Sequence, residues 1–169
     1  MTPIHPIITL FKECWMDGPD MAAERTREVG LQNSISPSFP IAVKKIIKSL
    51  QINLVHDLIP KQNNNKILGS YSKDKKTMFI NSEFDETMKR FVLSHMLGHL
   101  VLHGDQDFKE LYHEPTNPIE TQANIYAAHL LMPLWALHNA ILKGYKVPQL
   151  MQVFGVSAAA LSFQLDLLR

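Results

Sequence analysis

The chain has 169 residues, 46% of them hydrophobic and 20% charged, which is enough for one domain with a proper core. Its formal net charge of +1 argues against a protein that binds nucleic acid through bulk electrostatics. The single cysteine, Cys14, excludes an internal disulfide, and no segment has the roughly 18 apolar residues that span a bilayer.

The first part of the chain is predicted to be helical. Residues 1–18 lack the basic start and the unbroken apolar run of a signal peptide, so we expect a cytoplasmic protein. Residues 20–29 have helix-forming composition and end at Gly30, a residue suited to cap a helix, and a loop follows. Pro40 then opens an amphipathic helix over residues 41–51, where apolar side chains recur with a 3.6-residue period.

Short strands are predicted next. Residues 52–59 alternate in part between apolar and polar side chains, which indicates a strand. Residues 66–81 form two strand-like runs on either side of the polar turn Lys73-Asp74-Lys75, and this pattern predicts a hairpin.

The second half of the chain is predicted to be helical throughout. One long helix covers residues 82–103, with Ser82 and Asp85 placed as a variant capping box. A polar loop over residues 104–118 separates it from a helix over residues 119–132, which stops before a proline. Two or three short helices complete the chain. Helices, a small sheet and then more helices predict an α+β fold.

The long predicted helix contains RFVLSHMLGHLVLH, in which His95, His99 and His103 recur at every fourth position. Residues four apart lie about 6 Å from each other on one helical face, so His95 and His99 are placed to bind one zinc ion through their ring nitrogens. The spacing alone is weak evidence, because histidines packed on a core-facing helix give the same pattern. Met96 stands where the zinc-protease pattern H-E-x-x-H has a glutamate.

A zinc site of this kind needs a third protein ligand, commonly a carboxylate. Glu120 lies in the first turn of the next predicted helix, and Ala123, Ala127 and Ala128 give that helix a small-residue face that permits close approach to another helix. Close packing of the two helices would bring Glu120 to the histidines. The alternative is that Glu120 is simply favoured by the dipole at the helix N-terminus.

The two segments RFVLSHMLGHLVLH and IETQANIYAAHLLMP together resemble the paired signature of the ImmA/IrrE family of zincin-like metallopeptidases. That signature runs R-F-T-x-A-H-E-L-G-H-x-x-x-H and then E-x-E-A-N-x-F-A-A-x-L-L-M-P. The likeness extends over most of residues 37–168. It implies a zincin-like metallopeptidase fold with a small antiparallel or mixed sheet, a helix carrying H-x-x-x-H, and a C-terminal helical segment. We expect residues 37–169 to form this domain and residues 1–36 to be an N-terminal helical extension.

The resemblance also implies a ligand set for zinc. His95 and His99 match the two histidine ligands of the family, and Glu120 matches the third ligand by its place four residues before Asn124. Where the family often has a second glutamate, this chain has Gln122, so Glu120 is the only carboxylate that the segment offers.

Other matched positions have less defined roles. His103 matches a family histidine, which either contacts a ligand or the substrate or is simply exposed at the surface. Asn124 is expected to cap or orient a neighbouring group. The hydrophobic residues that follow it in this segment are expected to lie in the core; they are Tyr126, Leu130, Leu131 and Met132.

Met96 changes what chemistry the resemblance implies. In a working zincin, the glutamate at this position takes a proton from the attacking water and passes it to the leaving nitrogen. A thioether accepts hydrogen bonds weakly and has no proton to transfer. The loss of general acid–base catalysis is typically worth about 10² to 10⁴ in rate. His113 and Glu114, in the intervening loop, are the candidates for a replacement base.

Three hypotheses for function follow. The first, implied by the family resemblance, is a zinc-binding regulatory protein, catalytically weak or inactive, that acts on or binds a helix-turn-helix repressor or an antitoxin, as at phage, mobile-element or toxin–antitoxin loci. The second is an active zinc metallopeptidase that cleaves a repressor by a compensated mechanism. The third is a DNA-binding protein, because residues 147–165 have a helix-turn-helix cadence with Gly155 in the turn. Only Arg169 is basic after Lys146, which disfavours direct binding to nucleic acid.

Overall fold

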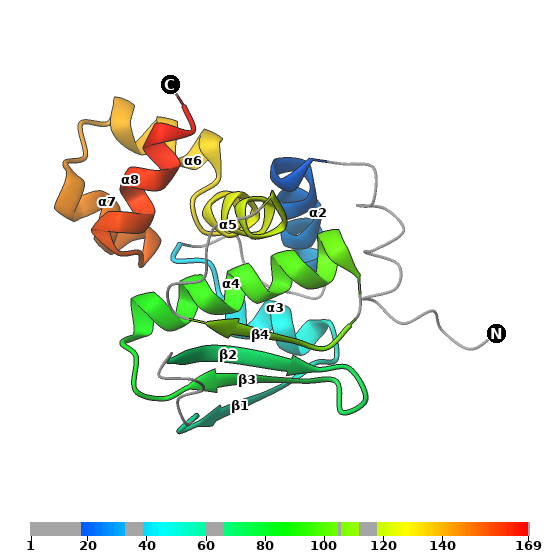
Figure 1. Cartoon of the computed structure of the whole chain (residues 1–169). Helices are drawn as coiled ribbons and strands as arrows, with labels where there is room; N and C mark the ends of the chain where they lie inside the picture. The colour runs from blue at the N-terminus through cyan, green and yellow to red at the C-terminus, as the bar shows by residue number, and fades with distance from the viewer. Residues whose placement is uncertain (1–17, 33–38, 60–65, 105, 112–117, 169) are drawn as a thin grey trace.

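A computed structural model of the chain shows a mixed sheet with helices stacked on one of its faces (Figure 1). The structure describes residues 18–32, 39–59, 66–104, 106–111 and 118–168. Its elements, in chain order, are α2 (Pro19–Gln32), α3 (Val43–Ser49), β1 (Asn53–Asp57), β2 (Ile67–Ser72), β3 (Thr77–Asn81), α4 (Glu86–His103), β4 (Phe108–Leu111), α5 (Pro118–Leu131), α6 (Leu134–Leu142), α7 (Val147–Phe154) and α8 (Ala158–Asp166). The predicted α+β class is confirmed.

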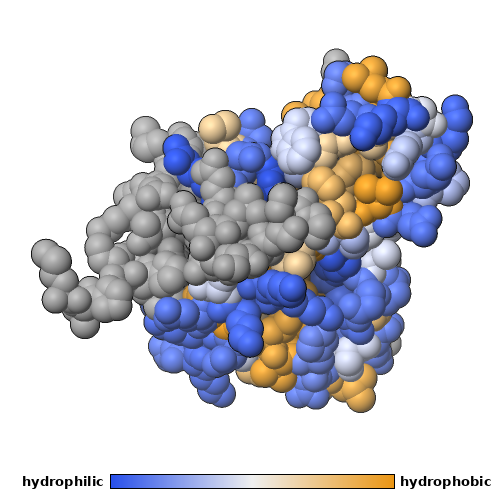
Figure 2. Space-filling view, turned by 180° about the vertical axis from the view of Figure 1, so that it is seen from behind, coloured by the Kyte–Doolittle hydropathy of each residue, from blue (hydrophilic) through white to orange (hydrophobic). Residues whose placement is uncertain are grey.

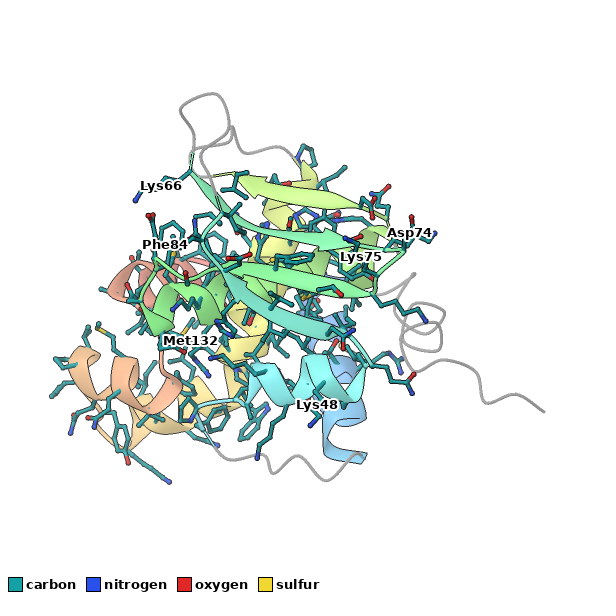
Figure 3. All side chains as sticks on the ribbon, turned by 90° about the horizontal axis from the view of Figure 1, so that it is seen from below. Lys48, Lys66, Asp74, Lys75, Phe84 and Met132 are labelled. Atoms are coloured by element: carbon teal, nitrogen blue, oxygen red, sulfur yellow. The ribbon has the colours of Figure 1, made fainter. Side chains whose placement is uncertain are left out.

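The sheet has the strand order β1-β3-β2-β4. β2 and β3 are antiparallel and form the predicted hairpin, whereas β1 runs parallel to β3. Figure 3 shows Asp74 and Lys75 at the turn of this hairpin and Lys66 and Phe84 toward the opposite end of the strands, where Lys66 Nζ lies 5.7 Å from the ring centroid of Phe84. One face of β2 is buried, because Ile67, Gly69 and Tyr71 point toward the helices.

β4 is a strand that the sequence did not predict. It lies within the expected polar loop over residues 104–118 and pairs with β2 in the antiparallel sense, with Phe108 opposite Tyr71. The rings of these two residues stack with their centroids 5.6 Å apart. A run as short and polar as FKEL has no periodic signal of its own, so its extended conformation comes from pairing with β2.

The start of α4 also differs from the prediction. Asp85 is the N-cap, and its side chain accepts a hydrogen bond of 2.9 Å from the backbone N–H of Met88. The proposed capping box between Ser82 and Asp85 is wrong, because Ser82 lies in the turn that leaves β3 and its N–H donates to the carbonyl of Asp57. Hydrogen bonds from the Thr87 hydroxyl and then from the Met88 N–H lower the pKa of Asp85, so the cap is anionic.

α2 continues two residues beyond Gly30, which therefore does not cap it. Packing against α5 outweighs the cost of a glycine inside a helix, which is only about 1 kcal/mol. In that contact, the hydroxyl of Tyr126 donates a 2.6 Å hydrogen bond to that of Thr26, and both side chains are buried. The division of the chain at residues 36 and 37 stays a prediction, and Cys14 lies outside the described residues.

The C-terminal segment contains three short helices, α6 to α8, in agreement with the prediction. α7 ends at Phe154 with Gly155 as its C-cap, whose φ of 61° is left-handed, and α8 follows with Ser157 as its N-cap. Arg90 of α4 fixes this segment by donating to the carbonyls of Ile41, Phe154 and Gly155 at 2.8, 3.2 and 3.0 Å.

Hydrophobic side chains gather on the surface of the C-terminal part of the molecule (Figure 2). The exposed ones include Leu134, Trp135, Ile141, Leu142 and Val147.

α5 packs on the side of α4 that faces away from the sheet, with α2 beside it (Figure 1). The predicted core residues of this segment are fully buried, as expected; they are Tyr126, Leu130, Leu131 and Met132.

Within the part of the chain that the structure describes, no helix by itself is long and apolar enough to cross a membrane. α5 and α6 together meet that test by length and composition, with a bend of 51° between them.

Candidate metal centre

α4 and α5 approach each other closely at Gly98. A Cβ atom added to Gly98 would lie 3.1 Å from the Cα atom of Ala123 and 3.0 Å from Cδ1 of Tyr126. The small-residue face predicted for α5, formed by Ala123, Ala127 and Ala128, is completely buried. Glycine on one helix and alanines on the other therefore let the two backbones come near enough for short side chains to meet across the contact.

A bulky residue at position 98 should push α5 away from α4. The atoms nearest to a Cβ there belong to the buried ring of Tyr126 and the backbone of Ala123, so Gly98→Leu cannot fit without a shift of α5. We expect a loss of about 1 to 3 kcal/mol in the free energy of unfolding, the usual cost of overpacking, together with weaker metal binding. Chemical denaturation and zinc titration measure the two effects, with the exposed, helical Gln152→Leu as control. Unchanged metal binding would contradict a site that depends on this helix contact.

Three side chains from these two helices converge on one point. His95 Nε2 lies 2.9 Å from His99 Nε2 and 3.1 Å from Oε2 of Glu120, and His99 Nε2 lies 3.3 Å from Oε1 of Glu120. One candidate ligand atom from each residue lies within 4.8 Å of the other two. Both histidines are 7% exposed and Glu120 remains partly open to solvent. The structure thus brings together the three residues that the sequence selected.

Hydrogen bonds at the opposite ring nitrogens define which atoms face the convergence point. His95 Nδ1 lies 2.8 Å from the side-chain oxygen of Asn124, an acceptor, so the imidazole proton belongs on Nδ1. His95 Nε2 then presents a lone pair to Glu120 and His99. Lone pairs and a carboxylate held this close repel one another unless a cation lies between them, and an N,N,O set of this kind suits zinc. The residues present therefore fit the ion that the family resemblance implies.

Glu120 is held in its anionic form. When the His95 ring is protonated on both nitrogens, its Nε2–H donates to Glu120, and this hydrogen bond is the strongest influence: it lowers the pKa of Glu120, against burial, which raises it. The charges that His99 and His95 carry when protonated lower it further. An ionised carboxylate is the form that binds a metal ion.

Three further contacts extend this site; the first, between His103 and a ligand, was one of the alternatives that the sequence left open, and the other two were not predicted. His103 Nδ1 lies 3.1 Å from His99 Nδ1, and His103 Nε2 lies 2.9 Å from the side-chain oxygen of Gln122, a residue that the sequence marked only as not a carboxylate. Phe108 of β4 packs against His99, with ring centroids 5.3 Å apart. The position of Phe108 next to His99 was not predicted, because residues 108–111 were expected to lie in a loop.

The side chain of Met96 points from α4 toward the sheet. It is fully buried, and a Cβ added to Gly69 of β2 would meet its sulfur atom at 2.7 Å. The thioether thus fills the space between α4 and β2 as a core residue. His113 and Glu114, the candidates for a replacement base, lie outside the described residues.

Comparison with known proteins gives three findings. Residues 48–166 match the sequence model of the IrrE N-terminal-like domain. The "uncharacterized immunity region protein 2" of Bacillus phage phi105 is 31% identical over 109 residues, which cover 57% of this chain and 69% of that protein. A solved transcriptional regulator from Mycobacterium tuberculosis has a similar fold, with a TM-score of 0.55 and 19% identity over 94% of this chain. This chain spans 50% of the length of that regulator.

Proposed function

Because this chain belongs to the IrrE N-terminal-like domain family, we propose that it is a zinc-binding regulatory protein that binds a helix-turn-helix repressor or an antitoxin and has little or no peptidase activity. The observation that carries the proposal is the convergence of His95, His99 and Glu120 beside a core methionine at position 96. This arrangement supports a metal site that is kept while the residue that would move a proton is replaced.

The roles of the individual residues follow from their contacts. Glu120 and the Nε2 atoms of His95 and His99 would hold the ion, and Asn124 keeps the lone pair of His95 directed at it by accepting the Nδ1 proton. When bound, zinc polarises a carbonyl oxygen and lowers the pKa of water. Met96 has no group that accepts a proton from water at neutral pH, so the proton-transfer step of peptide hydrolysis has no base at this position.

The partner is proposed from the family and from the relatives. One similar protein is named for the immunity region of a phage, and a protein of similar fold is a transcriptional regulator. Both names support a link to the control of transcription. Direct DNA binding has less support, because α8, the second helix of the helix-turn-helix cadence, contains no lysine or arginine to neutralise phosphates. An active peptidase would require a base such as His113 or Glu114.

A stable complex with the partner is the expected result if binding is the function that remains. The chain should be co-expressed with the helix-turn-helix regulator or antitoxin encoded beside it and applied to size exclusion at micromolar concentration. We expect the two proteins to elute together with the partner uncleaved, and an unrelated helix-turn-helix protein of similar size to elute separately. Separate elution of the cognate pair would remove the regulator-binding proposal.

A further inference from the structure

We propose that Gln122 and His103 are positioning residues, which hold His99 with the lone pair of its Nε2 atom directed at the metal. The inference rests on the proposed function. It concerns a chain of hydrogen bonds that begins at the surface of α5 and ends at the candidate metal centre on α4.

The chain can be followed atom by atom. The side-chain oxygen of Gln122 lies 2.9 Å from His103 Nε2, and because an amide oxygen only accepts, His103 Nε2 carries a proton and donates it. In its neutral form, the ring of His103 then has a lone pair on Nδ1, which lies 3.1 Å from Nδ1 of His99. His99 therefore donates through Nδ1 and has its lone pair on Nε2, 2.9 Å from His95 Nε2.

Each histidine ligand thus has its own orienting partner. His95 is oriented by its contact with Asn124, within the interface between the helices. His99 is oriented by two contacts in series, because His103 is one turn further along α4 and reaches across to Gln122 of α5. Residues of this kind select the tautomer and fix the ring, and replacing them typically weakens metal binding about 10- to 100-fold.

An amide differs from a carboxylate in this position. With Gln122 turned so that its nitrogen donates, the protons of the chain reverse, and His99 carries its proton on Nε2, where it blocks the metal. A carboxylate only accepts, so Gln122→Glu removes the reversed arrangement. The direction of the hydrogen bonds, and with it the availability of His99 as a ligand, is therefore set at Gln122.

The test measures zinc affinity by competition with a chromophoric chelator. We expect Gln122→Met and His103→Phe each to weaken binding about 10- to 100-fold, and Gln122→Glu to bind at least as tightly as wild type. Gln122 is exposed, so its variants leave the core intact, and thermal unfolding should confirm this. Gln152→Met, the same change on the exposed face of α7, is the matched control and should bind zinc like wild type.

Two further measurements separate orientation from a simple effect of charge. Long-range ¹H–¹⁵N spectra of the metal-free protein at alkaline pH should show His99 as the Nδ1-protonated tautomer in wild type. In Gln122→Met they should show a mixture of the Nδ1-protonated and Nε2-protonated tautomers. The gain from Gln122→Glu should disappear in a His103→Phe background, because the effect passes through His103.

The outcomes distinguish this inference from the proposed function. Wild-type protein that binds no zinc would overturn the proposed function and the inference with it. Wild-type protein that binds zinc, with Gln122→Met and His103→Phe binding equally well, would overturn the inference alone. The same would follow if Gln122→Glu tightened binding equally with and without His103.

Discussion

Replacing His99 by alanine should lower the zinc content of the protein from about one ion per chain to near zero. His99 Nε2 lies 2.9 Å from His95 Nε2 and 3.3 Å from the carboxylate of Glu120, so its removal leaves two of the three ligands. Two ligands hold zinc weakly, because structural and catalytic sites use at least three protein groups. Glu120→Gln keeps the shape of the side chain and removes its charge, and we expect a comparable loss.

Elemental analysis after dialysis against limiting zinc gives the measurement. His138→Ala removes an exposed histidine from α6 and serves as the control, since α6 contributes no residue to the candidate centre. Its zinc content should equal that of the wild type. Equal zinc content in wild-type and His99→Ala protein would mean that these side chains do not form the metal site.

The ligand triad could be predicted because local signals and the family resemblance agreed. His95 and His99 are one helical turn apart, and the alanines of α5 indicate a close helix contact; the structure has that contact at Gly98. These local signals allowed a contact between Glu120 and the histidines but left the helix-dipole alternative open, and the family resemblance selected Glu120 as the third ligand. The hairpin was predictable for the same reason, since β2 and β3 are neighbours in sequence.

Features that depend on distant pairing were not predictable in this way. β4 has four residues and becomes a strand through β2, which precedes it by more than thirty positions. The packing of Phe108 against His99 and the contact between His103 and Gln122 both depend on where β4 and the start of α5 lie in space. The capping box failed because Ser82 is used by the turn after β3, a contact made with β1.

The largest gain of activity is expected from Met96→Glu. Both side chains are unbranched, of similar length and favourable in helices, so the variant should fold. Met96 is fully buried against Gly69, and a carboxylate there loses solvation. We therefore expect Met96→Glu to have a lower thermal midpoint than wild type when both proteins lack zinc. Added zinc should make the difference between their midpoints smaller. That response would place the new carboxylate close to the metal.

The same variant should raise cleavage of the cognate partner by about two orders of magnitude or more, the usual contribution of a general base. Met96→Gln is the matched control, because it introduces a polar group of the same length that accepts no proton at neutral pH. Each protein would be incubated with the purified partner, with and without chelator, and cleavage followed on gels. Rapid, chelator-sensitive cleavage by wild type would refute the inactive-enzyme proposal. Equal rates for Met96→Glu and Met96→Gln would show that the missing base does not limit catalysis, because only the carboxylate restores the proton acceptor.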